Sequence, residues 1–163
     1  MRLVYNKYNS ASRNMIAPSQ AGLSLLNVET NGVSNGKGWW EGMAQGKLII
    51  VVDDQRGIRL LLEEVLVHYG YRVVTASDGE EALALVAQVQ PDLVLLDMNM
   101  PGLSGPETLR ALRERWPVLP VIMVTADEDD AHWATVQKLG VQGRISKPFD
   151  LDDLARIVAG CHA

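Results

Sequence analysis

Short runs of consecutive apolar residues alternate, from Lys47 onward, with longer segments in which apolar residues recur at helical spacing. The first run is rich in β-branched side chains, which is typical of a strand buried on both faces of a sheet. Comparable runs follow along the chain, and the last of them is short. The pattern predicts strands at residues 48–52, 71–76, 93–96, 121–124 and 144–146.

Helices are expected after each of these strands, at 55–69, about 77–90, about 104–116, 130–139 and from Asp150 nearly to the end of the chain. Ser77 and Ser104 each stand three residues before a glutamate, the spacing of a capping box, and Gly70 and Gly140 are candidate helix stops. Strands that alternate with helices predict parallel βα units in an open α/β sheet with helices on both faces. The pattern alone leaves the strand order open.

Residues 1–46 show no sustained period and carry several Asn, Ser and Gly residues. We therefore expect a flexible N-terminal extension at 1–46, followed by a folded domain at 47–163. The run from Trp39 to Gly42 must be encoded by a purine-rich sequence directly before the ATG codon of Met43. One hypothesis is that this sequence is a ribosome-binding site and that Met43 is the natural start.

Composition narrows the class of protein. The 163 residues are 47% hydrophobic and 21% charged, as in soluble globular proteins. A net charge of −5 argues against a nucleic-acid surface, and no apolar run approaches the roughly 20 residues that a membrane span needs. Cys161 is the single cysteine, so no disulfide can form within the chain. We expect a cytoplasmic protein that binds neither nucleic acid nor membrane.

Polar side chains stand at the carboxyl ends of the predicted strands, the edge at which open α/β sheets bind ligands. They are Asp53 and Asp54, Asp97, Thr125 and Lys147. Crowded carboxylates repel one another, and hard oxygen ligands without Cys or His favour Mg²⁺ as the compensating cation. A lysine and a hydroxyl beside that ion suit the oxygens of a phosphoryl group, with one carboxylate as nucleophile. Each residue alone has an ordinary explanation, such as helix capping for Asp53 or Asp54, whereas the combined set favours a phosphoryl site.

Four segments in this order carry a resemblance to a known family. They are Ile50-Val51-Val52-Asp53-Asp54, Leu95-Leu96-Asp97-Met98-Asn99-Met100-Pro101-Gly102, Val124-Thr125-Ala126 and Ser146-Lys147-Pro148-Phe149. They resemble the signature segments of response-regulator receiver domains of the CheY-like type. The resemblance covers the chain from Lys47 to about Gly160.

This resemblance implies a flavodoxin-like (βα)5 doubly wound fold with strand order 2-1-3-4-5. It implies that Asp97 is the phosphoacceptor, that Lys147 pairs with the phosphoryl oxygens and that Thr125 hydrogen-bonds to them in the active state. The implied ligands of Mg²⁺, for which Mn²⁺ can substitute, are Asp53, Asp54, Asp97 and the backbone carbonyl of Asn99. The Lys147–Pro148 peptide resembles the family's cis peptide.

Within the family the sequence is most similar to the single-domain intermediate of the sporulation phosphorelay, at 54–55, 57–59, 91–98 and 147–150. This implies a single-domain response regulator of a two-component system or phosphorelay. It would accept a phosphoryl group from a phosphohistidine donor and then pass it on or signal by phosphorylation-dependent protein binding. The implied partners are a histidine kinase, a histidine phosphotransferase with a four-helix bundle, or both. No DNA-binding output domain is expected, because the chain ends with its fifth predicted helix.

The first predicted helix carries more apolar residues than one buried face needs. We hypothesise that some of them form an exposed patch beside Asp97, on which the partner's four-helix bundle docks. The residues assigned to this docking patch are Gln55, Ile58, Leu61, Pro148 and Phe149.

Two features depart from the family or vary within it. Arg144 stands three residues before the signature lysine, where the family often has an aromatic residue that moves inward in the active state. Asn99 and Asp127 occupy variable positions, two residues after the acceptor and two after the strand-end threonine. The resemblance implies that these positions tune the lifetime of the acyl phosphate.

The leading interpretation is a phosphoacceptor protein with Mg²⁺-dependent self-phosphorylation and dephosphorylation, and not an enzyme. A phosphatase with an aspartyl intermediate is one alternative, since it needs the same chemical groups. Such enzymes typically place a second aspartate two residues after the nucleophile, whereas Asp97 is followed by Met98 and Asn99. A stand-alone interaction module with vestigial phosphorylation is the other alternative, and the complete set of site residues argues against it.

Overall fold

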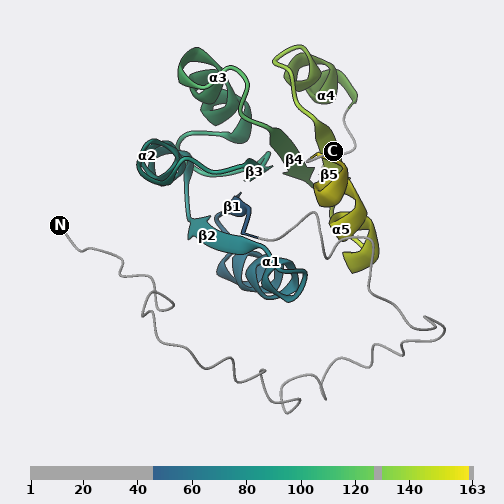
Figure 1. Ribbon diagram of the computed structural model, residues 1–163. Helices are drawn as coiled ribbons and strands as arrows, with labels where there is room; N and C mark the ends of the chain where they lie inside the picture. Colours follow the sequence, from purple (N-terminus) through teal and green to yellow (C-terminus); the bar gives the residue numbers. More distant parts are fainter. Residues whose placement is uncertain (1–45, 127–129, 162–163) are drawn as a thin grey trace. The chain divides into compact units, whose positions relative to one another are not determined.

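The computed structural model describes residues 46–126 and 130–161, and only the backbone of Asp130–His132. Residues 1–45 of the extension predicted at 1–46, the proposed start at Met43 and the variable position Asp127 lie outside this part of the chain. Within it, strands and helices alternate throughout (Figure 1). The strands are β1 (Leu48–Val52), β2 (Arg72–Ala76), β3 (Leu93–Asp97), β4 (Val121–Thr125) and β5 (Gly143–Ser146). The helices are α1 (Arg56–His68), α2 (Gly79–Val89), α3 (Gly105–Arg115), α4 (Asp130–Gln137) and α5 (Leu151–Gly160).

All five strands of the described residues pair in parallel, in the order β2-β1-β3-β4-β5. This confirms the flavodoxin-like order that the family resemblance implied. The central strands β1, β3 and β4 are buried along their full length, as their unbroken apolar runs predict. The register places Val52 beside Leu96, so β1 and β3 end at the same edge of the sheet.

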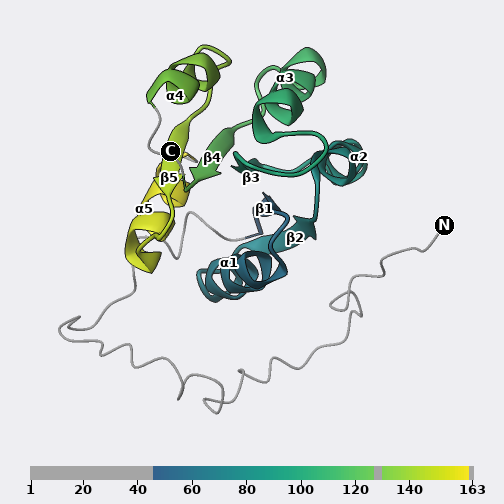
Figure 2. The ribbon, with the colours of Figure 1, turned by 180° about the vertical axis from the view of Figure 1, so that it is seen from behind.

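Two apolar layers cover the two faces of the sheet (Figures 1 and 2). Successive strand residues alternate between the layers, because side chains along a strand point to opposite faces. Ile49 and Val51 pack with α1 and α5, whereas Ile50 and Val52 pack with α2, α3 and α4. The helices therefore hold the sheet from both sides, and its carboxyl edge is left for the loops that carry the polar residues. No helix in the described ranges is long and apolar enough to cross a membrane.

Helix caps confirm part of the predicted pattern and correct one assignment. Ser104 and Glu107 form the predicted capping box of α3. Glu107 Oε2 accepts from Ser104 Oγ at 2.6 Å and from the backbone N–H of Ser104 at 2.9 Å, and these hydrogen bonds lower the pKa of Glu107. Asp150 caps α5 as expected. The prediction of Ser77 as the cap of α2 was wrong, because Asp78 accepts from the backbone N–H of Glu81. Asp78 stands three residues before Glu81, so the capping-box spacing also occurs one position later in the sequence.

Close packing fixes the loop that follows β3. The backbone N–H of Gly105, the first residue of α3, donates to the carbonyl of Met98 at 3.1 Å. A Cβ at Gly105 would collide with the carbonyl oxygen of Asp97, so the approach of α3 to this loop requires glycine. The end of β3 is thereby held against the start of α3.

At the amino-terminal ends of β4 and β5, a single arginine joins three segments. Arg113 of α3 donates through Nε to the carbonyl of Leu139 (2.9 Å), through Nη1 to that of Leu119 (2.8 Å) and through Nη2 to that of Gly140 (2.6 Å). Burial lowers the pKa of Arg113 from its ordinary value. The three bonds satisfy carbonyls in the loops that lead into β4 and β5.

Candidate functional site

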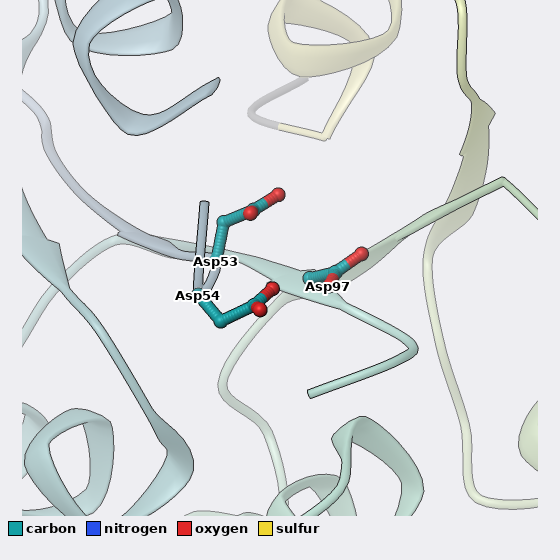
Figure 3. A group of neighbouring side chains, drawn as sticks. All are labelled: Asp53, Asp54 and Asp97. Carbon is teal, nitrogen blue, oxygen red and sulfur yellow. The ribbon is translucent and has the colours of Figure 1, made fainter. Parts of the chain in front are cut away.

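Three carboxylates gather where β1 and β3 end (Figure 3). Asp53 and Asp54 follow β1, and Asp97 is the last residue of β3. Each offers an oxygen that lies within 4.8 Å of the others. Asp53 and Asp97 are 1% and 3% exposed, whereas Asp54 is exposed to solvent. The predicted convergence of these residues on one sheet edge is therefore observed.

Lys147 follows β5 and reaches across the edge to this cluster. Its Nζ donates to Asp53 Oδ2 at 2.6 Å and to Asp97 Oδ1 at 2.9 Å. The Lys147–Pro148 peptide is cis, as the family resemblance implied. The backbone N–H of Lys147 also donates to the carbonyl of Thr125 at 2.7 Å, which ties the residue to the end of β4. One ammonium group thus connects the ends of three strands.

The charges at this site act against one another. Burial raises the pKa of Asp97, and the negative charges of Asp53 and Asp54 raise it further, while the hydrogen bond and charge of Lys147 lower it in part. Burial alone would lower the pKa of Lys147, but its hydrogen bonds to Asp53 and Asp97 outweigh burial and the pKa is raised. Lys147 is therefore held as a cation, and the carboxylates still exceed it in charge.

The turn between β1 and α1 is held by side-chain bonds to its backbone. Asp53 Oδ1 accepts from the backbone N–H of Gln55 at 2.8 Å. Arg59 Nη1 donates to the carbonyl of Asp53 at 2.6 Å and to that of Asp54 at 3.0 Å. Sequence reasoning gave no role to Arg59. The available signal was a basic residue near a helix N-terminus, where the helix dipole disfavours positive charge and another reason for its presence is needed.

The remaining predicted site residues lie at the same edge. The Thr125 side chain is 1% exposed and ends β4. Asn99 is exposed, two residues after Asp97. The backbone N–H of Met98 donates to the carbonyl of Val124 at 2.8 Å, so the loop that contains Asn99 is anchored to β4.

The donor set fits a hard divalent cation. Carboxylate oxygens are the ligands that Mg²⁺ prefers, and the ion usually keeps several waters, which an exposed Asp54 permits. Three carboxylates against the single charge of Lys147 also leave a negative excess that such a cation would balance. The residues at this edge are therefore suited to Mg²⁺ on charge and on donor chemistry.

The predicted docking patch differs in exposure from the hypothesis. Gln55 and Pro148 are exposed, but Ile58, Leu61 and Phe149 are half-buried and pack against the layer between the sheet and helices α1 and α5. The spacing of Ile58 and Leu61 also suits the buried face of α1, which explains the difference for these two residues. The strongly exposed apolar side chains of α1 are Leu60 and Val67, at 53% and 52%.

Arg144, at the position where the family often has an aromatic residue, contacts an aromatic residue of its own. Its Cζ lies 5.3 Å from the centroid of the Trp133 ring, within the range of a cation–π interaction. Trp133 lies in α4 and packs against the layer on that face of the sheet. The pair links α4 to β5.

Comparison with known proteins places this arrangement in a family. The family model of the response regulator receiver domain matches residues 49–159. Sporulation initiation phosphotransferase F of Bacillus subtilis is 41% identical over 106 residues, which cover 65% of this chain and 86% of that protein. The alkaline phosphatase synthesis transcriptional regulatory protein PhoP of the same organism is 41% identical over 103 residues, covering 63% of this chain and 43% of that protein. The solved structure of chemotaxis protein CheY4 of Vibrio cholerae has a TM-score of 0.68 and 30% identity, covering 71% of this chain and 98% of that one.

The fold and the acidic edge are those of a doubly wound α/β signalling domain. The chain belongs to the response regulator receiver domain family, and sporulation initiation phosphotransferase F is among its relatives. Receiver domains are phosphoacceptors of two-component signalling that bind Mg²⁺ through acidic residues and interact with histidine kinases and phosphotransferases. The chain spans less than half of the transcriptional regulator, so that protein's DNA-directed activity is not transferred to it.

Proposed function

We propose that this protein accepts a phosphoryl group from a phosphohistidine donor onto Asp97 and then passes it on or signals by phosphorylation-dependent protein binding. The observation that carries the proposal is the position of Lys147 Nζ, 2.9 Å from Asp97 Oδ1 and 2.6 Å from Asp53 Oδ2. An ammonium group beside a buried carboxylate can pair with the negative oxygens of a phosphoryl group that approaches this carboxylate.

In the proposed reaction a carboxylate oxygen of Asp97 attacks the phosphorus atom of the donor. An O–P bond forms, the N–P bond to the donor imidazole breaks, and its electron pair returns to the imidazole nitrogen. Lys147 pairs with the phosphoryl oxygens, and the hydroxyl of Thr125, at the end of the adjacent strand, hydrogen-bonds to one of them. The main contributions of the protein are thus positioning and charge stabilisation.

The cation of the proposed site is Mg²⁺, or Mn²⁺ in its place. It would be held by Asp53, Asp54, Asp97 and the backbone carbonyl of Asn99, and it supplies positive charge that neutralises the phosphoryl oxygens. The burial of Asp53 and Asp97 beside the exposed Asp54 supports this assignment, because the exposed carboxylate leaves the cluster open to a hydrated ion from solvent.

A role in a phosphorelay is the specific form of the proposal that the comparisons favour. The chain is 41% identical to sporulation initiation phosphotransferase F over 86% of that protein. The proposed partners are a histidine kinase and a histidine phosphotransferase with a four-helix bundle, acting in the cytoplasm. Solved structures similar to this chain include the CheX–CheY complex of Borrelia burgdorferi with BeF3 and Mg²⁺, at 26% identity and a TM-score of 0.69.

Intact mass after incubation with acetyl phosphate tests the proposal. We expect a gain of one phosphoryl group that requires Mg²⁺ and is absent in Asp97→Asn. Asp153→Asn, which changes an exposed carboxylate of α5, is the matched control and should gain the same group. Phosphorylation that persists in Asp97→Asn would overturn the assignment of the acceptor, and turnover of a generic phosphate ester would indicate a phosphatase instead.

The docking role of α1 is tested separately. Ile58→Ala should slow phosphoryl transfer from a phosphohistidine protein and leave phosphorylation by acetyl phosphate unchanged. Val67→Ala, near the other end of the same helix, is the control and should change neither rate. An equal loss with both donors in Ile58→Ala would contradict a docking role.

A further inference from the structure

The guanidinium group of Arg59 makes contacts that the phosphoryl chemistry does not require. One nitrogen, Nη1, donates to the carbonyl oxygens of both Asp53 and Asp54, at 2.6 and 3.0 Å. The backbone N–H of Arg59 donates to the carbonyl of Gln55 at 3.1 Å, so the helix that carries the guanidinium begins at the same turn. The contact therefore lies within the segment that presents two of the three clustered carboxylates.

These two carbonyls belong to the peptide planes on either side of Asp54. Peptide units are planar, so the backbone of Asp54 has two soft torsions, and each is a rotation relative to one of these planes. A donor that holds both carbonyls restricts both rotations. Arg59 thereby fixes the direction in which the Cα–Cβ bond of Asp54 points.

Asp54 is the member of the cluster that needs such support. Lys147 contacts Asp53 and Asp97, and both of those side chains are almost fully buried. The carboxylate of Asp54 is exposed, and it makes no side-chain hydrogen bond or ion pair within residues 46–126 and 130–161. Its position near the other two carboxylates is set by its backbone, and the backbone is held by Arg59.

We propose that Arg59 is a positioning residue for the cation site, which acts by holding the backbone around Asp54 so that its carboxylate stays directed toward Asp53 and Asp97. The inference rests on the proposed function of this edge. It assigns to Arg59 a role in Mg²⁺ affinity and not in the transfer step itself, because Arg59 contacts only backbone oxygens of the cluster.

The test measures Mg²⁺ binding directly, by calorimetric titration of the full chain, for wild type, Arg59→Ala and Arg59→Lys. Loss of a group that orients a metal ligand typically weakens metal affinity by about 10-fold or more, and we expect Arg59→Ala to show this loss. Arg59→Lys retains a donor and should recover part of the affinity. Arg56→Ala removes one positive charge from the exposed start of the same helix, and it should stay within about twofold of wild type, since a surface charge contributes little.

A second measurement separates positioning from catalysis. The initial rate of phosphorylation by acetyl phosphate, measured over a series of Mg²⁺ concentrations, should fall in Arg59→Ala at low Mg²⁺ and return to the wild-type rate at saturation. A melting temperature in EDTA equal to that of wild type would show that the loss of affinity is local. If Arg59→Ala does not fold, Arg59→Lys supplies the same comparison.

The outcomes are distinct for the two proposals. Equal Mg²⁺ affinity in wild type, Arg59→Ala and Arg59→Lys would overturn the positioning role and leave the proposed function intact. A rate that stays low at saturating Mg²⁺ would also overturn it, because Arg59 would then act on the transfer step. A wild-type chain that binds Mg²⁺ but gains no phosphoryl group would refute the proposed function and leave the affinity comparison valid.

Discussion

Replacement of Lys147 by methionine would remove the ammonium group that lies between two buried carboxylates and keep most of the side chain's apolar volume. Lys147 is 13% exposed, and its partners Asp53 and Asp97 are 1% and 4% exposed at their side chains. The hydrogen bonds at 2.6 and 2.9 Å are therefore largely shielded from solvent. We expect the variant to fold with lower stability and to accept phosphoryl groups slowly.

The magnitude follows from the charges that are left behind. Breaking a buried ion pair by removal of one partner typically costs about 3–5 kcal/mol. Repulsion between two carboxylates about 5 Å apart is about 3 kcal/mol at an effective dielectric constant of about 20, which agrees with that range. We therefore expect Lys147→Met to lose about 3 kcal/mol of unfolding free energy in EDTA at pH 8, or about 10 °C in melting temperature.

The loss should depend on pH in a direction that the two pKa shifts define. The raised pKa of Lys147 means that its stabilisation is present at neutral pH and is lost only as pH rises above the ordinary lysine value of 10.5. In the variant, the pKa of Asp97, already raised by burial, loses the opposing effect of Lys147 and rises further. Asp97 then takes up a proton as pH falls, so the difference in stability from wild type should shrink as pH falls from 8 toward the ordinary aspartate value of 3.8.

Urea unfolding in EDTA and in saturating Mg²⁺ gives the measurement, with Lys138→Met as the control that removes an exposed lysine. Because a divalent cation binds the native cluster, Mg²⁺ should stabilise Lys147→Met more than it stabilises wild type. Phosphorylation by acetyl phosphate should be about a hundredfold slower, the usual effect of removing one electrostatic stabiliser. A stability in EDTA equal to that of Lys138→Met would refute the reasoning, since the cluster would then carry no repulsive charge.

Three further predictions concern the surrounding fold. Arg113→Met should lower the free energy of unfolding by about 2–4 kcal/mol, measured in urea, because three carbonyls lose a charged donor. Arg115→Met, on the exposed side of α3, is the control and should lower it by less than about 0.5 kcal/mol. Gly105→Ala should lower the melting temperature and disturb phosphorylation, because its Cβ collides with backbone, whereas Gly57→Ala, which enters open space, should be neutral or stabilising. The lowered pKa of Glu107 contributes stability above its ordinary value of 4.5 that is lost as pH falls through the folded value, so melting temperatures of Glu107→Gln and wild type should converge at acid pH. Equal losses of stability in Arg113→Met and Arg115→Met, or in Gly105→Ala and Gly57→Ala, would contradict the role given to Arg113 or Gly105. A difference in melting temperature between Glu107→Gln and wild type that stays constant across pH would contradict the role given to Glu107.

The strands and most helix boundaries could be predicted because local pattern and tertiary burial agree in this chain. The run at 48–52 is apolar at every position, and the structure buries every position of β1. Ser104 and Asp150 cap helices where their side chains suit the exposed backbone N–H groups. The start of α2 was placed one residue early, because Ser77 and Asp78 are both good caps with a glutamate three residues on, and local pattern does not rank them. Strand order came from the family resemblance, since pairing depends on contacts that periodicity does not encode.

The five strand-end residues could be predicted as a set because parallel strands bring their carboxyl ends to one edge whatever the sheet order. That argument places Asp53, Asp97 and Lys147 together without any knowledge of their rotamers. It does not state which carboxylate Lys147 contacts, and the structure shows that it contacts two. Exposure on α1 was harder to predict, because Ile58 and Leu61 extend a face that is already apolar and the sequence does not say where burial ends.

Arg59 and Arg144 show where inference from residue type ends. Both are long cations in helix or strand positions where charge is commonly solvated. The place of Arg59 near a helix N-terminus signals that it has a partner, but neither pattern nor charge indicates which partner either arginine has. Arg59 finds two backbone carbonyls, and backbone acceptors carry no residue-specific signal. Arg144 finds the ring of Trp133 on α4, a contact worth about 1 kcal/mol that joins two elements across the edge of the sheet. Arg144 therefore has to be interpreted together with the residue that contacts it. The aromatic group that β5 lacks at this position is supplied by Trp133 on α4.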